Sequence, residues 1–252
     1  DEDTNDLTTA RTVLRRYSLG KGETHRTVAE ALRDIDASQG RLAERIDDAF
    51  SVKPITEDFY DDYKRVYDLL SDELRNKGLE LEQANRYAHI TLNRLMFFYY
   101  LQKKGWIGER KEFVRWFHEK YESSKASGEF HEKWLSPLFF DGMNQPAGEP
   151  IDSNLPDTIE NAISEIPHMN GGLFQKTKLD QNDTFLSDTA LNTVIRSFLE
   201  EYNFTVTEES PYDIDVAVDP AMLGKIYESL IAEEDRGDSG IFYTPRTEVD
   251  LM

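Results

Sequence analysis

The sequence predicts a mostly α-helical protein, an irregular multi-helix domain with at most a small β-hairpin. Apolar residues recur along much of the chain at the three- and four-residue spacing of amphipathic helices. Strand-like alternation is weak and confined to 204–207 and 214–218, which are the two candidates for the hairpin. Prolines and an Asn-Gly-Gly turn are concentrated in 134–175, so we expect that region to be irregular.

The composition excludes several classes of protein. The 252 residues suffice for one large domain or two small ones, and 38% hydrophobic residues indicate a globular chain. No apolar run approaches the roughly 18 residues that a membrane span needs. We expect no membrane association and, because no secretory leader precedes Asp1, a cytoplasmic location. The lack of cysteine excludes disulfides, thiolate metal sites and a cysteine nucleophile.

The charge of the chain permits two interpretations. With 49 acidic and 29 basic residues the formal net charge is −20, which opposes contact with phosphate if the solvent is dilute. The same excess of acid suits a protein from a salt-rich cytoplasm, where charges are screened. Because the acidic residues are spread along the chain and only 13 of the basic residues are lysine, we favour a salt-adapted (halophilic) surface.

The first half of the chain contains the clearest helical patterns. Residues 1–50 are polar and predict short helices packed as an arm. After Pro54, Thr56 with two acidic residues behind it predicts a helix start, and Gly78 predicts its end. Its buried face is Phe59, Tyr63, Val66, Tyr67, Leu70 and Leu74. Residues 84–104 are apolar on nearly every side and predict the central helix of the domain.

Further helices are predicted downstream. Phe113, Trp116, Phe117 and Tyr121 mark one, which a polar loop follows at 123–129. Ser187 or Asp188 caps another, whose buried face is Ala190, Leu191, Val194, Ile195, Phe198 and Leu199. Asp219 and Pro220 open a third, with six apolar residues of 222–231 turned inward.

The sequence contains no recognisable set of catalytic or metal-binding residues. The five histidines lack metal-ligand spacing, and Asp213, Asp215 and Asp219 lack the glycine and the closing glutamate of a calcium loop. The segment Asn170–Phe174 is either a structural turn or a loop that faces a ligand or nucleic acid. We therefore predict no catalytic residues and no metal site in this chain.

The last residues predict the start of a helix. Thr244 is a cap, Pro245 occupies the first helical position, and Val249 and Met252 begin an apolar face. The pattern stops about two turns later without a C-terminal signal. We therefore expect the chain to be a fragment of a longer protein in which this helix continues.

An ordered set of motifs resembles a known family. The matching segments are Phe50–Val52, Ile55–Tyr60, Leu92–Phe97, Leu101–Trp106, Leu138–Phe140, Ile166–Phe174, Val218–Glu228 and Gly240–Pro245. Together they cover roughly residues 45–252 and resemble single-chain type IIG/IIL-like restriction–modification enzymes with a γ-type adenine-specific DNA methyltransferase domain, and related phage-defence methylases. The resemblance implies a helical connector between a nuclease and a methyltransferase that acts on double-stranded DNA.

The resemblance also implies an S-adenosylmethionine site. Phe242, Tyr243, Thr244 and Pro245 resemble the methyltransferase motif that lies against the methionine end of this cofactor, and the amides of a helix start suit its carboxylate. The Gly-rich motif and the Asn-Pro-Pro-aromatic motif that holds a flipped adenine are missing from this chain. We therefore expect methyl transfer only in the full-length protein, and no tight cofactor binding by this chain.

These observations divide the chain into three parts and suggest DNA contacts. We predict an N-terminal arm at 1–50, a helical connector domain at 51–238 and the start of a methyltransferase domain at 239–252. The densest basic cluster predicts contacts to the DNA backbone, and its members are Arg94, Lys103, Lys104, Arg110 and Lys111. The same cations also suit the C-terminal dipole of a helix. The alternative function is a stand-alone acidic helical module that binds a protein partner and no DNA.

Overall fold

The structure of the chain is a computed structural model. It describes residues 14–17, 25–33, 35, 40–107, 110, 112–124, 126–149, 151, 154–168, 172–180, 184–205, 213–215 and 217–218. The described elements of the first part of the chain are β1 (Leu14–Arg16), α1 (Arg26–Arg33), α2 (Leu42–Ala49), α3 (Val52–Asn76), α4 (Leu81–Lys104), α5 (Phe113–Ser123), the π-helices η2 (Phe130–Leu135) and η3 (Leu138–Gly142), and then α6 (Asp157–Ser164). They are followed by the 3₁₀ turns η4 (Gly172–Phe174) and η5 (Lys178–Asp180), then α7 (Asp188–Arg196), η6 (Leu199–Glu201) and β2 (Asp213–Asp215). The predicted fold class, mostly α, is confirmed.

Helix α3 starts earlier than the sequence predicts. It begins at Val52 rather than at Thr56, so that Pro54 lies in its first turn. The first four N–H groups of a helix have no acceptor within the helix, and a proline there loses no hydrogen bond. The predicted end is confirmed, because Gly78 has a φ of 96° and the N–H of Leu79 donates to the carbonyl of Leu74 at 3.2 Å.

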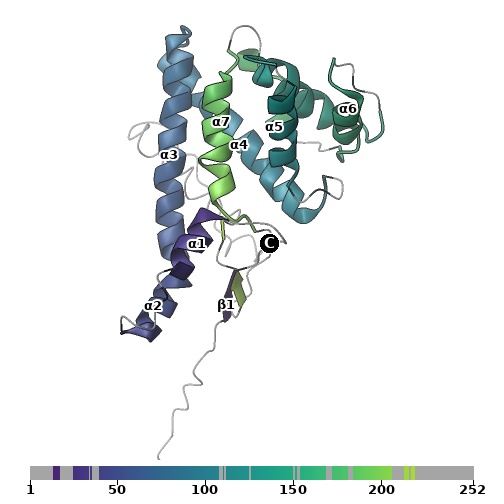
Figure 1. The fold of residues 1–252 in the computed structure, drawn as a ribbon. Coiled ribbons are helices and arrows are strands. Elements are labelled where there is room, and N and C mark those ends of the chain that lie inside the picture. Colours follow the sequence, from purple (N-terminus) through teal and green to yellow (C-terminus); the bar gives the residue numbers. More distant parts are fainter. Residues whose placement is uncertain are drawn as a thin grey trace, which may run out of the picture.

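Helix α4 is buried along most of its length, as the sequence predicts. It packs on α3, and α7 lies beside α3 (Figure 1). Its end is fixed by Gly105, which has a φ of 71°, and by the N–H of Trp106, which donates to Leu101 at 3.0 Å. The predicted faces of α3 and α7 are buried too, with every residue of both predicted sets at most 6% exposed.

The core between these helices is rich in aromatic rings. The ring of Phe59 on α3 lies 5.0 Å from that of Phe198 and 4.9 Å from that of Tyr202, both of which follow α7. Phe204 then packs against Tyr99 of α4 at 5.0 Å. Such tilted and edge-on pairs are favourable beyond the apolar area that they bury. The rings therefore join α3 and α4 to the residues that follow α7.

The predicted irregular region contains more helix than expected. Two consecutive π-helices, η2 and η3, occupy 130–142, and α6 follows Pro156. The apolar residues Ile159 and Ile163 are one helical turn apart and are both buried, which explains why α6 forms despite the prolines around it. The prediction of irregular structure was therefore wrong for 134–142 and for 157–164.

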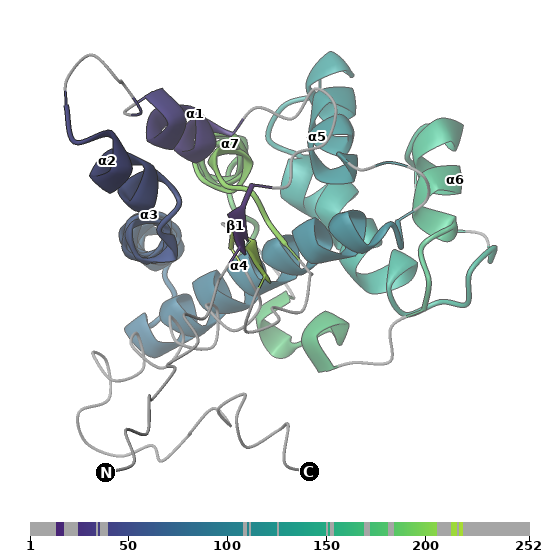
Figure 2. The same cartoon turned by 90° about the horizontal axis from the view of Figure 1, so that it is seen from below.

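The N-terminal helices lie on one side of the molecule and α6 on the other (Figure 2). Tyr17 donates its hydroxyl to the carbonyl of Ala49, and its ring contacts that of Phe50. Val28 of α1 is buried, and Nδ1 of His25 lies 3.3 Å from the carbonyl of Glu200. The short helices predicted for this region are present, and they contact the body of the protein.

The small sheet differs from the predicted hairpin. Strands β1 and β2 pair in parallel, with Arg15 opposite Ile214. Phe204 and Val218 do meet, yet as a parallel bridge in which Val218 accepts from Thr205 at 3.0 Å. A hairpin is antiparallel, so the predicted arrangement was wrong. Because β1 and β2 are almost 200 residues apart in the sequence, no local pattern could predict that they pair.

The helix predicted at 219–231 and the segment 239–252 lie outside the described residues. None of the helices that the structure describes has the length and hydrophobicity required to cross a bilayer. The division of the chain into arm, connector and methyltransferase start stays a prediction.

Candidate functional site

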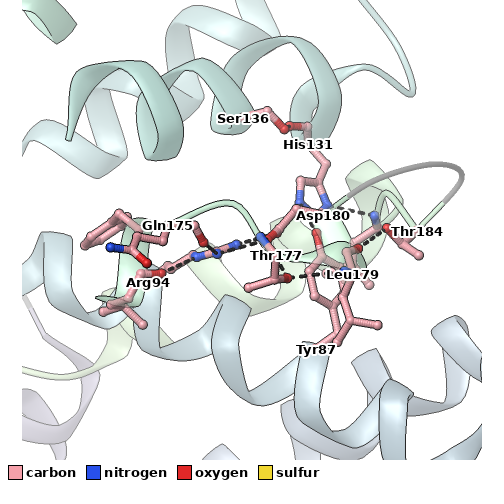
Figure 3. Close-up of polar contacts among 12 residues, drawn as sticks. Tyr87, Arg94, His131, Ser136, Gln175, Thr177, Leu179, Asp180 and Thr184 are labelled. Carbon is pink, nitrogen blue, oxygen red and sulfur yellow. Dashed lines mark hydrogen bonds and ion pairs between the residues drawn. The ribbon is translucent and has the colours of Figure 1, made fainter. Parts of the chain in front are cut away.

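Arg94 lies at the centre of a buried polar network (Figure 3). Its side chain, 1% exposed, donates to the two carboxylate oxygens of Asp180 at 2.6 and 3.2 Å. It also donates to the carbonyls of Leu173 at 2.9 Å and of Gln175 at 3.3 Å. The ring of Phe140 lies 4.9 Å from the guanidinium carbon. Arg94 thus ties α4 to residues 172–180, which we call the 172–180 loop.

This position removes Arg94 from the predicted DNA contacts. A phosphate contact needs an exposed cation, and this guanidinium is enclosed by protein groups that use its donors. A sequence pattern identified Arg94 as a polar residue within an apolar helix. It could not show that the partner carboxylate lies 86 residues further along the chain.

Asp180 holds the other side of the network. It accepts from the backbone N–H of Thr177 at 2.7 Å and from the hydroxyl of Thr177 at 2.8 Å. Burial acts to raise the pKa of Asp180, but the hydrogen bonds from Arg94 and Thr177 outweigh burial and lower this pKa below its ordinary value. Asp180 is therefore ionised at neutral pH and balances the charge of Arg94.

Neighbouring side chains fix the rest of the loop backbone. Asn144 donates to the carbonyl of Phe174 at 2.7 Å, and Thr184 donates to that of Leu179 at 2.6 Å. With the two carbonyls that Arg94 binds, four backbone oxygens of the 172–180 loop are held by side chains from outside it. The loop is therefore positioned by the helical body and not by its own short helices.

His131 supports the segment that follows the loop. Its Nδ1 accepts from the N–H of Leu186 at 2.8 Å, which assigns the proton of the neutral ring to Nε2. The hydroxyl of Tyr87 lies 3.4 Å from this Nε2 (Figure 3). Burial lowers the pKa of His131 to about 4. His131 is consequently a neutral structural residue at pH 7.

The predicted basic cluster is only partly described. Lys103 and Lys104 form the last turn of α4, where Lys103 is half-buried and Lys104 is exposed. Arg110 is exposed and lies over the ring of Trp116, with 4.2 Å between its guanidinium carbon and the ring centroid. Lys111 lies outside the described residues. The structure therefore places three of the predicted contacts in and after the end of α4.

Three further exposed residues were not predicted as contacts from the sequence. Trp106 follows the two lysines at the end of α4 and is 50% exposed. Lys176 and Lys178 are exposed on the 172–180 loop. Lys176 and Lys178 lie two and four residues after the Asn170–Phe174 turn that the sequence did identify, so their position was the available signal.

The remaining candidate residues are the histidines, the acidic residues of the possible calcium loop and the residues of the possible cofactor site. Among the residues described, no three His, Asp or Glu side chains are grouped so as to hold a metal ion. His25 and His118 are buried and His168 is exposed. Phe242, Tyr243, Thr244 and Pro245 lie outside the described residues, as does Asp219.

Comparison with known proteins relates the chain to restriction–modification enzymes. No family model matches it, and no solved structure matches it. A curated protein of Methanocaldococcus jannaschii, provisionally named a type II restriction enzyme and methyltransferase, is 29% identical over 164 residues. The match covers 64% of this chain and 13% of that protein. The chain thus corresponds to a small part of a much longer relative.

Proposed function

We propose that this chain is the helical connector of an adenine-specific DNA methyltransferase or restriction–modification enzyme, where it supports one side of the DNA channel. The observation that carries the proposal is the similarity over 164 residues to a protein named as a restriction enzyme and methyltransferase. The ordered motifs between residues 50 and 245 point the same way. In the full-length protein, S-adenosylmethionine would supply the methyl group for the adenine amino group.

The helical body suits the role of a connector. Two long helices, α3 with 25 residues and α4 with 24, pack together and span about 36–38 Å each. Buried aromatic rings and the Arg94–Asp180 pair join them to later segments of the chain. A closely packed body of this kind moves as a unit, so it would keep the modules at its two ends in a fixed register.

The end of α4 is the first candidate contact with DNA. Lys104 is exposed, and no carboxylate among the described residues pairs with it. Lys103, Arg110 and Lys111 extend the cluster along the chain. Contacts of this kind position a protein on the DNA backbone without reading its sequence. The cations also compensate the negative end of the α4 dipole, and the two roles are compatible.

The cofactor role of Phe242, Tyr243, Thr244 and Pro245 belongs to this proposal. An N-terminal helix turn supplies free amides that can bind a carboxylate, and two aromatic rings supply an apolar wall. In the full-length protein these residues would form one side of a pocket. The rest of the pocket would come from the methyltransferase domain, so the isolated chain is not expected to hold the cofactor.

One observation favours the alternative, an acidic module that binds a protein. Leu32 of α1 and Leu42 and Ile46 of α2 are 40–43% exposed, which suits a contact with another protein surface. The same surface would also suit contact with a neighbouring module of a restriction–modification enzyme. The two functions therefore need a test that does not depend on this surface.

The test is to read the gene on both sides of this region and to assay its full-length product. We expect an in-frame Gly-rich motif and an Asn-Pro-Pro-aromatic motif, and transfer of a labelled methyl group from S-adenosylmethionine to adenine in duplex DNA. A gene that lacks both motifs, with no partner gene that carries them, would overturn the proposal in favour of the interaction module.

A further inference from the structure

The 172–180 loop carries two exposed lysines on a backbone that buried groups hold in place. Arg94 binds the carbonyls of Leu173 and Gln175, and Asn144 binds that of Phe174. Lys176 follows these three residues directly, and Lys178 begins η5. A charged group on a fixed backbone loses less entropy when it binds a ligand than one on a mobile segment. The backbone that carries the two lysines is therefore already in position before a ligand binds.

These two lysines are not used in ion pairs within the described part of the chain. Lys176 lies over the ring of Phe140, with 5.6 Å from Nζ to the ring centroid, and no carboxylate of the described residues pairs with it. Lys178 is exposed and likewise lacks a described carboxylate partner. The chain has 49 acidic residues and a net charge of −20, so two neighbouring lysines that pair with no carboxylate of the described residues are unusual in it.

Gly172 opens the loop and is exposed. A Cβ at this position would meet no atom of the described residues within 4 Å, and its φ is outside the left-handed region. Among the described residues, therefore, neither packing against a neighbour nor a left-handed φ accounts for the glycine. A glycine is also used where a ligand must approach the backbone closely, and this use remains available here.

We propose that Gly172, Lys176 and Lys178 form a second DNA contact that binds the sugar–phosphate backbone of a duplex. The proposal rests on the proposed function, because it takes DNA as the substrate of the full-length enzyme. The two lysines supply the charge, and Gly172 lets the backbone approach a phosphate. The buried Arg94–Asp180 pair, instead of binding DNA, positions this loop.

The position of the loop on α4 agrees with a shared duplex. The loop is anchored at Arg94, and Lys104 lies ten residues further along the same helix. Ten residues of helix correspond to about 15 Å, which is less than half of the roughly 34 Å in one turn of B-DNA. One duplex is therefore long enough to contact both surfaces.

Lysine footprinting of the full chain tests the proposal directly. The chain is acetylated with and without a 30-base-pair duplex, at about 50 mM salt where phosphate contacts are strong, and modified lysines are quantified by mass spectrometry. We expect the duplex to slow the acetylation of Lys176 and Lys178 severalfold and to leave Lys120 and Lys133 unchanged. Equal rates at Lys176 and Lys178 with and without saturating DNA would overturn the proposal, as would the absence of any duplex binding.

Matched charge variants provide a second measurement. Two double variants each remove two positive charges. Lys176→Gln/Lys178→Gln removes them from the 172–180 loop, and the control, Lys120→Gln/Lys133→Gln, removes them from α5 and η2. The loop variant should lower the slope of log K against log salt by about 1.8, because each lost phosphate contact contributes about 0.9. The control variant should keep the slope of the unmodified chain. An equal loss in both variants would show a general charge effect and would contradict the proposed surface.

The Gly172→Ala variant tests whether DNA approaches the backbone at Gly172, without a change in the stability of the fold. Because its Cβ would contact nothing described, the variant should unfold at the same temperature as the unmodified chain, yet bind the duplex severalfold more weakly. Unchanged affinity for the duplex would show that Gly172 is not part of the DNA contact. If the loop variants bind normally while the full-length enzyme methylates DNA, this inference fails and the proposed function stands.

Discussion

Replacement of Arg94 by methionine should destabilise the fold strongly, because it leaves the carboxylate of Asp180 buried without its cation. Both side chains are 1% exposed, and two hydrogen bonds join them. Removal of one partner from a buried ion pair typically costs about 3–5 kcal/mol. The carbonyls of Leu173 and Gln175 lose their donor as well, which adds on the order of 1 kcal/mol each.

Urea denaturation followed by circular dichroism measures this loss. The expected decrease is a large part of the roughly 5–15 kcal/mol that stabilises a typical domain. Arg75→Met is the matched control, because Arg75 pairs with Asp72 at 3.5 Å with both side chains more than half exposed. An exposed pair of this kind contributes about 0–1 kcal/mol.

A double variant distinguishes the cost of an unpaired buried charge from the loss of the ion pair itself. Arg94→Met/Asp180→Leu removes both charges, so it should be more stable than Arg94→Met alone, although it loses the polar contacts of the loop. If Arg94→Met costs no more than Arg75→Met, the buried pair does not position the 172–180 loop and the reasoning is refuted.

Three other predictions concern packing, pH and the cofactor. Gly142→Ala should lower stability by about 1–3 kcal/mol in thermal denaturation, because its Cβ would lie 2.5 Å from Cγ2 of Ile163; a loss as small as that of Gly172→Ala would contradict this. Burial lowers the pKa values of His89 and His131 to about 4, so the unfolded chain binds protons first, and stability present above about pH 6.5 should fall as the pH drops toward 4; urea midpoints that stay constant over this range would exclude the effect. Calorimetry should detect no S-adenosylmethionine binding by the isolated chain, and tight binding would show that the pocket is already complete.

Local patterns predicted the helices whose buried face and end signals are both visible in the sequence. The buried face and the glycine end of α3 follow from helical spacing and from Gly78, and the start of α7 follows from Ser187, whose hydroxyl accepts from Ala190 at 3.2 Å. Helix α6 and the π-helices were missed, because the prolines of that region obscured a short buried face. A helix of eight residues with only two buried residues gives too weak a period to detect.

The candidate site is formed by contacts between residues far apart in the sequence, and a local sequence pattern cannot predict such contacts. Arg94 was placed among the DNA contacts because it adds charge near Lys103, whereas Asp180 and the loop carbonyls enclose it. The parallel pairing of β1 with β2 joins segments at opposite ends of the chain. By contrast, the Asn170–Phe174 turn was identified from its glycines, and the lysines of the proposed surface follow it.

The proposed function requires that this chain belong to an enzyme that methylates adenine in DNA. The most direct measurement is a genome-wide map of N6-methyladenine in cells that carry the intact gene and in cells from which it has been deleted. Methylation at one recognition sequence should disappear on deletion and return when the gene is restored. An identical map in both strains would contradict the claim.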